Sequence, residues 1–423
     1  MKLSAIRIHA IDYLKTNSFG LPIYRYLKTR QLKKRFSINE ISKFTPVRSE
    51  SEQVRFNLVL PSLRKTKVFA GVSTALYFFQ KLTENEKYCR IVVMGDEAYD
   101  NNFTYQIEEY SRAQVGHRSN KELFFYSDCD TIDIAANDLF IFTSWKTAFS
   151  FRSIVKWQKD AFNIQDRKSI YLIQDFEPGF FSWSSEYMLA ESTYSTNPND
   201  IIAVFNSSEL ASYFTMNGYC FFQEYWFKPN LNKALKRRLL DSIDKSGNAR
   251  KKRILIYGRP SEQRNAFEII RYSLELWSET YEHAADWEIF SLGEGFMNIT
   301  LANNTIVSKG KLSLDEYADY MLSSYAGISL MASPHPSYPP LEMSTFGIRT
   351  ITNKFASKDL GTFNENIISI DSCSPEEIAR ILARLCDEFC SYEPKFQLNH
   401  EYLDGNSLDC TIMQAKRALL EKL

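Results

Sequence analysis

Residues 253–270 read RILIYGRPSEQRNAFEII, and this stretch predicts a strand, a tight turn and a helix in succession. The first six residues are mostly apolar and predict a buried strand that ends at Gly258. A helix is predicted over 264–279, because apolar residues recur every three or four positions from Phe267 to Trp277. A buried strand that leads directly into an amphipathic helix is typical of a parallel α/β domain.

The same alternation of strand and helix runs along most of the chain. Because the predicted strands are almost continuously apolar, they fit parallel sheets built from right-handed βαβ units and covered on both faces. The other predicted strands lie at 55–60, 90–95, 138–144, 168–175, 200–206, 287–293, 304–310, 325–332, 349–353 and 367–370. The other predicted helices lie at 73–82, 147–158, 207–218, 313–322, 341–347 and 374–390.

A polar segment, DSIDKSGNARKKR at 241–253, interrupts this alternation as an interdomain linker would. The sequence therefore predicts an α/β protein with two Rossmann-like, doubly wound domains. Ligands of such sheets bind at the carboxyl ends of the strands, so we expect the site in the cleft between the domains. The expected parts are a basic helical extension at 1–53, one domain at 54–245 and a second domain at 246–400.

Composition and motifs exclude several classes of protein. The 51 Lys and Arg residues balance 51 Asp and Glu residues, whereas binding to duplex nucleic acid needs a basic excess. No apolar run of about 20 residues predicts a membrane span, and the N-terminus lacks the apolar core of a secretory signal. The seven scattered cysteines predict reduced thiols in a cytoplasmic protein. Dinucleotide, P-loop, serine-hydrolase and zinc-protease motifs are missing from the sequence.

Basic residues follow the strand that ends at Gly258. Arg259 comes directly after it, and Arg264 lies near the start of the next helix. Two guanidinium groups beside a helix N-terminus suit a diphosphate, although an arginine here also fits an interdomain salt bridge. Lys309 and Lys311, between a later strand and helix, are candidates for a phosphate contact or are ordinary surface lysines.

The segment LMASPHPSYPPLEMSTFG at 330–347 packs four prolines into a loop between a predicted strand and a short helix. Prolines stiffen such a loop and hold its backbone in place for a ligand. Glu342 is predicted in the first turn of that helix. A carboxylate there either interacts favourably with the helix dipole or accepts a hydrogen bond from a sugar hydroxyl. His335 is interpreted as a structural or orienting group.

Polar residues also mark the carboxyl edge of the first predicted sheet. Gly71, in a predicted strand-to-helix turn, allows backbone N–H groups to approach a ligand. The segment YLIQDFEPGFFSW at 171–183 places Gln174, Asp175 and Glu177 at that edge, where acids hold an acceptor hydroxyl or act as a base. The alternative is an apolar loop with solvated acids. Aromatic residues of this loop that suit stacking on a sugar ring are Phe180, Phe181 and Trp183.

The segment Arg25–Arg35, RYLKTRQLKKR, carries six basic residues and no acidic one. This segment predicts a basic amphipathic helix, which either packs on the main body of the protein or binds weakly to an anionic membrane surface.

Four motifs, in order, resemble the bacterial rhamnosyltransferases that extend cell-surface glycans, of the S-layer type in glycosyltransferase family 4. They are YLIQDFEPGFFSW, IYGRPSEQRN, GKLSLDEYADYM and SPHPSYPPLEMSTFG, and the resemblance covers roughly residues 54 to 420. It implies a GT-B fold, in which the donor lies between two Rossmann-like domains and the last helix, within 401–423, returns to the first domain. It also implies a retaining enzyme that needs no cofactor or divalent metal. The implied donor is dTDP-β-L-rhamnose, the implied acceptor is a glycan, free or carried on lipid, and the implied location is the cytoplasm or the inner membrane face.

The resemblance also assigns roles to single residues. Arg259 and Lys311 correspond to ligands of the donor diphosphate, Glu342 to the acid that holds a ring hydroxyl of the nucleotide, and Arg264 to a second basic residue. Asp175 joins Arg259 and Lys311 as the predicted catalytic residues. The remaining predicted donor-binding residues are Gly71, Gly258, Lys309 and Tyr338, and the predicted acceptor-binding residues are Gln174, Asp175, Glu177 and Trp183.

Two positions depart from the wider family. Pro334 stands where many members carry a glutamate that contacts a hexose hydroxyl, which favours a 6-deoxy sugar such as rhamnose. Gln174 replaces a histidine, which makes Asp175 the acid to test. The alternatives are a GT-B transferase that uses a UDP-hexose and a non-catalytic protein that binds nucleotide sugars. The sequence does not identify the acceptor, the glycosidic linkage that is formed or the oligomeric state.

Overall fold

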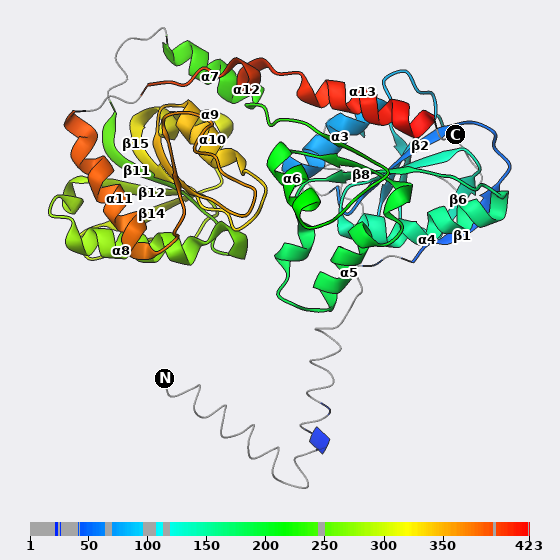
Figure 1. The fold of residues 1–423 in the computed structure, drawn as a ribbon, viewed down its shortest axis with the longest axis horizontal. Coiled ribbons are helices and arrows are strands. Elements are labelled where there is room, and N and C mark those ends of the chain that lie inside the picture. The colour runs from blue at the N-terminus through cyan, green and yellow to red at the C-terminus, as the bar shows by residue number, and fades with distance from the viewer. Residues whose placement is uncertain are drawn as a thin grey trace.

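The structure is a computed structural model that describes residues 22–23, 26, 41, 43–63, 70–95, 107–112, 119–243, 250–391, 395–421 and 423. Two α/β domains lie side by side along the long axis of the molecule (Figure 1). Apart from Tyr26, the predicted basic helix at Arg25–Arg35 lies outside these residues. Within the described part of the chain, no helix has the length and apolar character that a bilayer crossing requires.

The first domain contains an eight-stranded parallel sheet. Helices cover both of its faces, and the central strands are buried along their whole length, as their apolar sequences predict. In spatial order the strands are β10 (Gln223–Trp226), β9 (Ile201–Phe205), β8 (Ser169–Ile173), β7 (Asp138–Phe142), β2 (Arg55–Leu60), β3 (Cys89–Val93), β5 (Lys121–Phe125) and β4 (Ser111–Arg112). The helices are α3 (Ala70–Leu82), α4 (Trp145–Phe162), α5 (Ser185–Ser195) and α6 (Ser208–Met216), with short 3-10 helices η2 (Glu177–Phe180) and η3 (Pro198–Asp200).

The second domain contains a seven-stranded sheet that is parallel except for its first edge strand. Its strands in spatial order are β13 (Ile299–Thr300), β14 (Thr305–Gly310), β12 (Glu288–Gly293), β11 (Lys251–Gly258), β15 (Ser324–Ile328), β16 (Arg349–Asn353) and β17 (Ile367–Ile370). Two helices, α8 (Phe267–Thr280) and α11 (Pro375–Asp387), pack together on one face. The other face carries α7 (Lys233–Ile243), α9 (Leu314–Ser323) and α10 (Tyr338–Thr345). Short 3-10 helices are η4 (Gln263–Asn265), η5 (Ala284–Asp286) and η6 (Glu388–Cys390).

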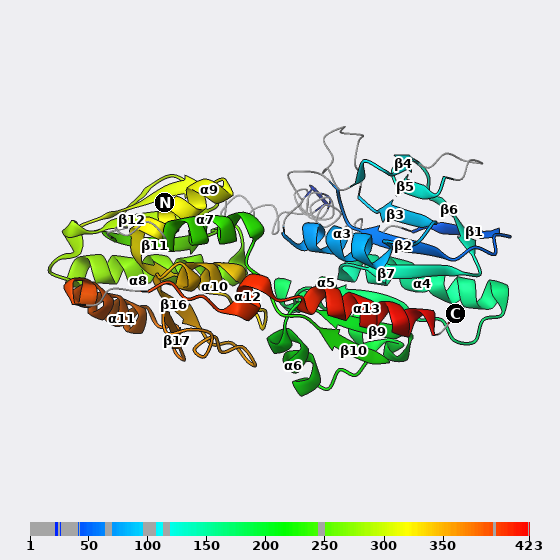
Figure 2. The same ribbon diagram turned by 90° about the horizontal axis from the view of Figure 1, so that it is seen from above.

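The chain crosses between the domains twice, and the two crossings lie against each other. Phe227 belongs to the core of the first domain, whereas Leu231 belongs to that of the second. The chain returns to the first domain after helix α12 (His400–Asp404). Helix α13 (Ser407–Leu420) then packs on α3 and the first sheet (Figure 2). The backbone N–H of Leu231 donates to the carbonyl of Tyr402 at 2.8 Å and so joins the two crossings.

The first crossing lies before α7, not in the predicted linker at 241–253. Helix α7 occupies 241–243 and buries Leu235 and Leu239 in the second domain, while β11 already begins at Lys251. The amphipathic pattern of KALKRRLLDSI is the signal that this prediction overlooked.

Several other boundaries also differ from the prediction. The predicted strand at 325–332 ends at Ile328, and the side chain of Asn353 then bonds the backbone N–H and carbonyl of Met331. The helix predicted at 341–347 begins at Tyr338, so Glu342 lies beyond its first turn. Part of the predicted extension at 1–53 forms strand β1 (Thr45–Ser49), which pairs in parallel with β6 (Thr131–Ala135). Among the described residues, the elements that were not predicted are β1, β4, β5, β6, β10, β13, α5, α7, α12 and the 3-10 helices η2, η3 and η5.

Candidate active site between the domains

A cavity of about 420 Å³ lies where the carboxyl ends of the two sheets face each other. Gln174 follows β8 and Asn206 follows β9 in the first domain, whereas Arg259 follows β11 in the second. This is the position that two facing doubly wound sheets give to a ligand site. Of the residues singled out in the sequence, those that line it are Gly71, Gln174, Asp175, Glu177, Phe180, Arg259, Arg264, His335 and Tyr338.

Asp175 and Arg264 join the two walls of this cavity. Arg264 Nη1 donates to Asp175 Oδ2 at 2.8 Å, and its guanidinium lies 4.2 Å from the ring centroid of Phe180. Ser333, in the proline-rich loop, donates to Asp175 Oδ1, and the backbone N–H of Phe176 donates to the same oxygen at 2.8 Å. The carboxylate that the sequence places at the acceptor edge is therefore held by the domain that carries the basic residues.

The proline-rich loop is ordered by its own side chains. His335 donates its backbone N–H to Ser333 Oγ at 3.0 Å, and its Nδ1 accepts from the N–H of Ser337 at 3.0 Å. Burial lowers the pKa of His335 to about 4, so the ring is neutral at pH 7, as its acceptor role requires. Ser337 has a φ of 68°, a strained value for a residue other than glycine. His335 therefore orients the loop, and this agrees with its structural interpretation.

Polar contacts of Arg259 and Ser261 hold the turn after β11 in place. Arg259 Nη2 lies 3.1 Å from Glu262 Oε1, and the backbone N–H and hydroxyl of Ser261 donate to Glu294 at 3.0 and 2.8 Å. Gly258 is needed for packing, because a Cβ there would lie 2.3 Å from Ser291 Oγ and 2.8 Å from the ring of Phe267. Gly258 thus lets α8 start close to the strand end and brings its N-terminus to the cavity.

Glu342 lies in a group of tyrosines in the second domain. The hydroxyl of Tyr317 donates to Glu342 Oε2 at 3.0 Å, and Tyr257 and Tyr338 of the same group line the cavity. Burial raises the pKa of Glu342 to about 7 and that of Tyr338 to about 12. A carboxyl group of this kind changes its charge near neutral pH. Its protonated form can donate a hydrogen bond, whereas its ionised form only accepts and is the stronger acceptor.

Two first-domain residues that were predicted to bind the acceptor make internal contacts. Glu177 accepts from the backbone N–H of Trp145 in the first turn of α4, an interaction that the helix dipole favours, and burial raises its pKa to about 7. Gln174 Nε2 donates at 3.0 Å to the carbonyl of Gly71, which lies in the first turn of α3 rather than in a turn before it.

Other predicted residues do not reach the cavity wall. Trp183 is 94% exposed and stacks on Tyr187, with ring centroids 5.8 Å apart. Lys309 and Lys311 are exposed at the end of β14, where Gly310 pairs with Leu292. Both lysines therefore lie at the same carboxyl edge as Arg259, two strands away from it.

Two asparagines in the wall were not predicted. Asn206 Nδ2 donates to the carbonyl of Gln174 at 2.9 Å, while its buried Oδ1 has no partner within the described residues. Asn265 lies beside Arg264, just before α8. The available signal was a polar residue directly after a buried strand or before a helix, a pattern that many turns share.

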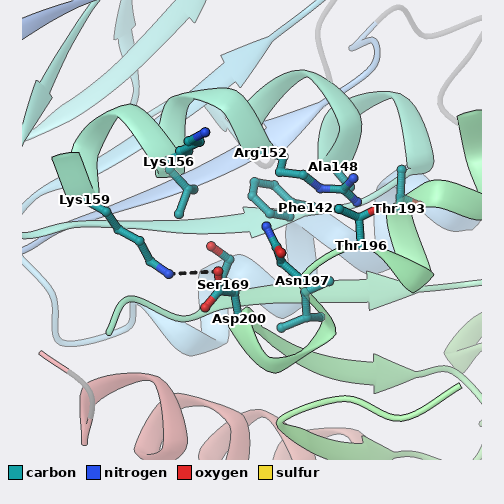
Figure 3. A pocket seen from close by; sticks show the side chains of 12 residues that line it. Phe142, Ala148, Arg152, Lys156, Lys159, Ser169, Thr193, Thr196, Asn197 and Asp200 are labelled. Atoms are coloured by element: carbon teal, nitrogen blue, oxygen red, sulfur yellow. Dashed lines mark hydrogen bonds and ion pairs between the residues drawn. The ribbon is translucent and has the colours of Figure 1, made fainter. Parts of the chain in front are cut away.

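A second cavity, of about 300 Å³, lies on the first domain between α4 and the segment after α5 (Figure 3). Three of its four charged side chains are engaged internally: Lys159 pairs with Asp200 at 2.8 Å, and Arg152 donates to the carbonyl of Ser192 at 2.8 Å. The cavity between the domains is therefore the candidate active site.

The sequence matches both domains of one protein family, in order. The N-terminal domain of WsaF matches residues 55–208, and its C-terminal domain matches residues 252–383. Together the two matches span more than half of the chain and include Asp175, Arg259 and Glu342. The chain belongs to the WsaF family. Both walls of the cavity therefore come from WsaF domains.

Individual proteins also resemble this chain in sequence or in fold. The O-antigen biosynthesis protein RfbC of Myxococcus xanthus is 26% identical over 221 residues, which are 50% of the WsaF-family chain and 16% of RfbC. HepE of Anabaena in complex with UDP superposes with a TM-score of 0.53 at 11% identity, over 87% of this chain and 98% of HepE. Sucrose-phosphate synthase of Thermosynechococcus elongatus gives 0.51 at 8% identity, over 87% and 95%. The predicted GT-B fold is confirmed, whereas family 4 and a rhamnose donor stay predictions.

Proposed function

We propose that this chain is a glycosyltransferase that moves L-rhamnose from dTDP-β-L-rhamnose onto a growing bacterial surface glycan. The WsaF family and the GT-B fold support transfer from a nucleotide sugar. The name of RfbC supports a surface polysaccharide as the product, although the chain spans only a small part of that relative. Pro334, in place of a glutamate, supports a donor sugar that lacks one hydroxyl.

The observation that carries this proposal is the presence of Arg259 and Arg264 in one cavity with Asp175. In the proposed reaction the bond between C1 of the sugar and the diphosphate oxygen breaks, and C1 forms a bond to the acceptor oxygen. Negative charge develops on the departing phosphate oxygens, which take the proton of the acceptor hydroxyl. The guanidinium groups are already in place to stabilise that charge. Asp175 positions the acceptor hydroxyl at the opposite wall. Retention of configuration is part of the proposal and rests on the family.

The proposed reaction needs no metal ion. The described residues include no group of three or more His, Cys, Asp or Glu side chains placed to hold one. The positive charge that a divalent cation supplies in other transferases would come from Arg259 and Arg264. The sequence also lacks the motifs that are typical of hydride and acyl transfer.

Thermal unfolding with different nucleotides tests this function at the level of the donor. A ligand present at 100 times its Kd adds about 2.7 kcal/mol of stability. We expect dTDP to raise the midpoint more than UDP or GDP does. A larger shift with UDP would favour a UDP-hexose transferase instead. If none of the three raised the midpoint, the nucleotide-sugar assignment would be wrong.

The acceptor is proposed to be a glycan carried on lipid at the inner face of the cytoplasmic membrane. The basic segment Arg25–Arg35 is the proposed contact with anionic lipid, because its six cations have no acidic neighbours within the segment. The rest of the chain would then work as a peripheral enzyme.

A further inference from the structure

Asn265 has a buried amide that the fold does not use. The residue is 1% exposed, and neither Nδ2 nor Oδ1 of its side chain has a hydrogen-bond partner among the described residues. Buried amides are normally paired, because each polar atom that loses water without a replacement destabilises the folded state. A position that keeps such a group without an internal partner is a candidate for contact with a ligand.

The local backbone does not explain this side chain. Asparagine often caps a helix, but the N-cap of α8 is Ala266, and no side-chain cap is formed there within the described residues. The backbone of Asn265 already forms the turn, since its N–H donates to the carbonyl of Glu262 at 2.9 Å. Any residue with the same backbone conformation could form that bond.

The surroundings indicate an anionic ligand. Asn265 contributes to the wall of the interdomain cavity together with Arg259 and Arg264. It also lies next to the N-terminus of α8, a helix that runs to Thr280 and whose first N–H groups carry partial positive charge. An oxyanion placed here would meet two guanidinium groups, a helix N-terminus and a neutral amide donor.

We propose that Asn265 binds the sugar diphosphate of the donor. Its Nδ2 donates to a diphosphate oxygen, and its Oδ1 accepts from a hydroxyl of the attached sugar. A nucleotide sugar offers both kinds of partner side by side, which matches an amide with both atoms unpaired. This inference rests on the proposed function, since it assigns one more residue to that donor site.

The test compares Asn265→Ala and Asn265→Asp with the wild-type chain, using dTDP and UDP as probes in calorimetric titrations. We expect Asn265→Ala to bind the preferred nucleotide about tenfold more weakly, because one hydrogen bond to a charged group is lost. Asn265→Asp should bind more weakly still, because its carboxylate repels the diphosphate. Asn217→Asp, which adds the same charge at the exposed end of α6, is the matched control and should bind like the wild type.

Unfolding without ligand separates this role from a structural one. Removal of an unpaired buried amide should leave the thermal midpoint of Asn265→Ala unchanged or raise it. A lowered midpoint would assign Asn265 to the fold and overturn the inference. Wild-type affinity in both Asn265 variants would also overturn it while leaving the proposed function intact. A wild-type chain that binds neither nucleotide would instead refute the proposed function.

Discussion

Asp175 and Arg264 form an ion pair across the interdomain cavity, with 2.8 Å between Asp175 Oδ2 and Arg264 Nη1. The pair joins a residue proposed to hold the acceptor to a residue proposed to bind the donor. A diphosphate bound as proposed would compete with Asp175 for the guanidinium of Arg264. Donor binding would then free the carboxylate for the acceptor hydroxyl.

Substitutions at the two ends of this ion pair should have opposite effects on nucleotide affinity. We expect Asp175→Asn to bind dTDP about tenfold more tightly, since the competing charge is removed, and Arg264→Ala to bind it at least tenfold more weakly. Calorimetric titration measures both, and the double variant shows whether the effects are coupled. If Asp175→Asn bound dTDP more weakly than the wild type, the competition would be refuted.

Arg259→Ala should reduce turnover more than Lys311→Ala does. Arg259 lines the cavity and can bridge two phosphate oxygens, whereas Lys311 is exposed and acts as a point charge. Loss of a preorganised charge costs about 2–4 kcal/mol in the transition state, or about 30- to 1000-fold in rate. We expect Arg259→Ala near the upper end of this range and Lys311→Ala near or below its lower end. Full turnover in both variants would show that neither Arg259 nor Lys311 stabilises the diphosphate.

Glu342 should make donor affinity depend on pH. Its pKa is raised by burial from 4.5 to about 7, so the carboxylate that is predicted to accept a donor hydroxyl forms as the pH rises through about 7. We therefore expect KM for the donor to fall between pH 6 and pH 8, a range of about one unit on either side of that pKa. Glu342→Gln should raise KM and remove this dependence. A pH profile that is the same in both proteins would contradict the assignment.

The same group should affect stability in the opposite direction. Because the pKa of Glu342 is higher in the folded state than its ordinary value of 4.5, the folded state holds the proton over that interval. Its contribution to stability is therefore present at low pH and is lost as the pH rises towards about 7. Glu342→Gln should flatten part of this slope, and the remainder should persist because the pKa of Glu177 is raised in the same way.

The sequence predicted the parallel sheets because their strands have a simple physical signature. Segments such as IIAVF in β9 are buried at every position, so they read as continuous apolar runs. Strand β10, QEYW, has no fully buried residue, and α5 buries only three of its residues, so neither produced a clear pattern. The pattern of a short segment reflects how much of it is buried, and β10 and α5 were missed because they bury little.

The candidate site was predicted only in part, because its contacts join distant segments. Asp175 and Arg264 are 89 positions apart in the sequence. Ser333, which donates to Asp175, is 158 positions away from it. Strand ends showed which residues share an edge, but not that an aspartate of one domain pairs with an arginine of the other. Trp183 had the right residue type in the right loop, yet its side chain lies in solvent.

The basic segment Arg25–Arg35 should give weak, salt-sensitive binding to anionic vesicles. Six cations near such a surface contribute about 1 kcal/mol each before screening. Co-sedimentation at low and high salt measures this binding, with Lys233 and Arg237 on α7 neutralised as a control. Glutamine at Lys28, Arg30, Lys33, Lys34 and Arg35 should reduce binding without changing donor affinity. Binding that is absent at low salt, or unchanged in this variant, would leave the segment with a structural role.

Turnover of dTDP-β-L-rhamnose in the presence of EDTA tests the central claim most directly. The wild-type chain, given a lipid-linked glycan acceptor, should release dTDP and extend the glycan by one rhamnose without added metal. Asp175→Asn should bind the donor and yet release dTDP at least about 100-fold more slowly, in line with the loss of a group that positions and activates a nucleophile. Activity that is lost in EDTA and restored by Mn²⁺ would contradict the metal-free mechanism. A wild-type chain that binds dTDP but releases none from any nucleotide sugar would contradict the assignment as a transferase.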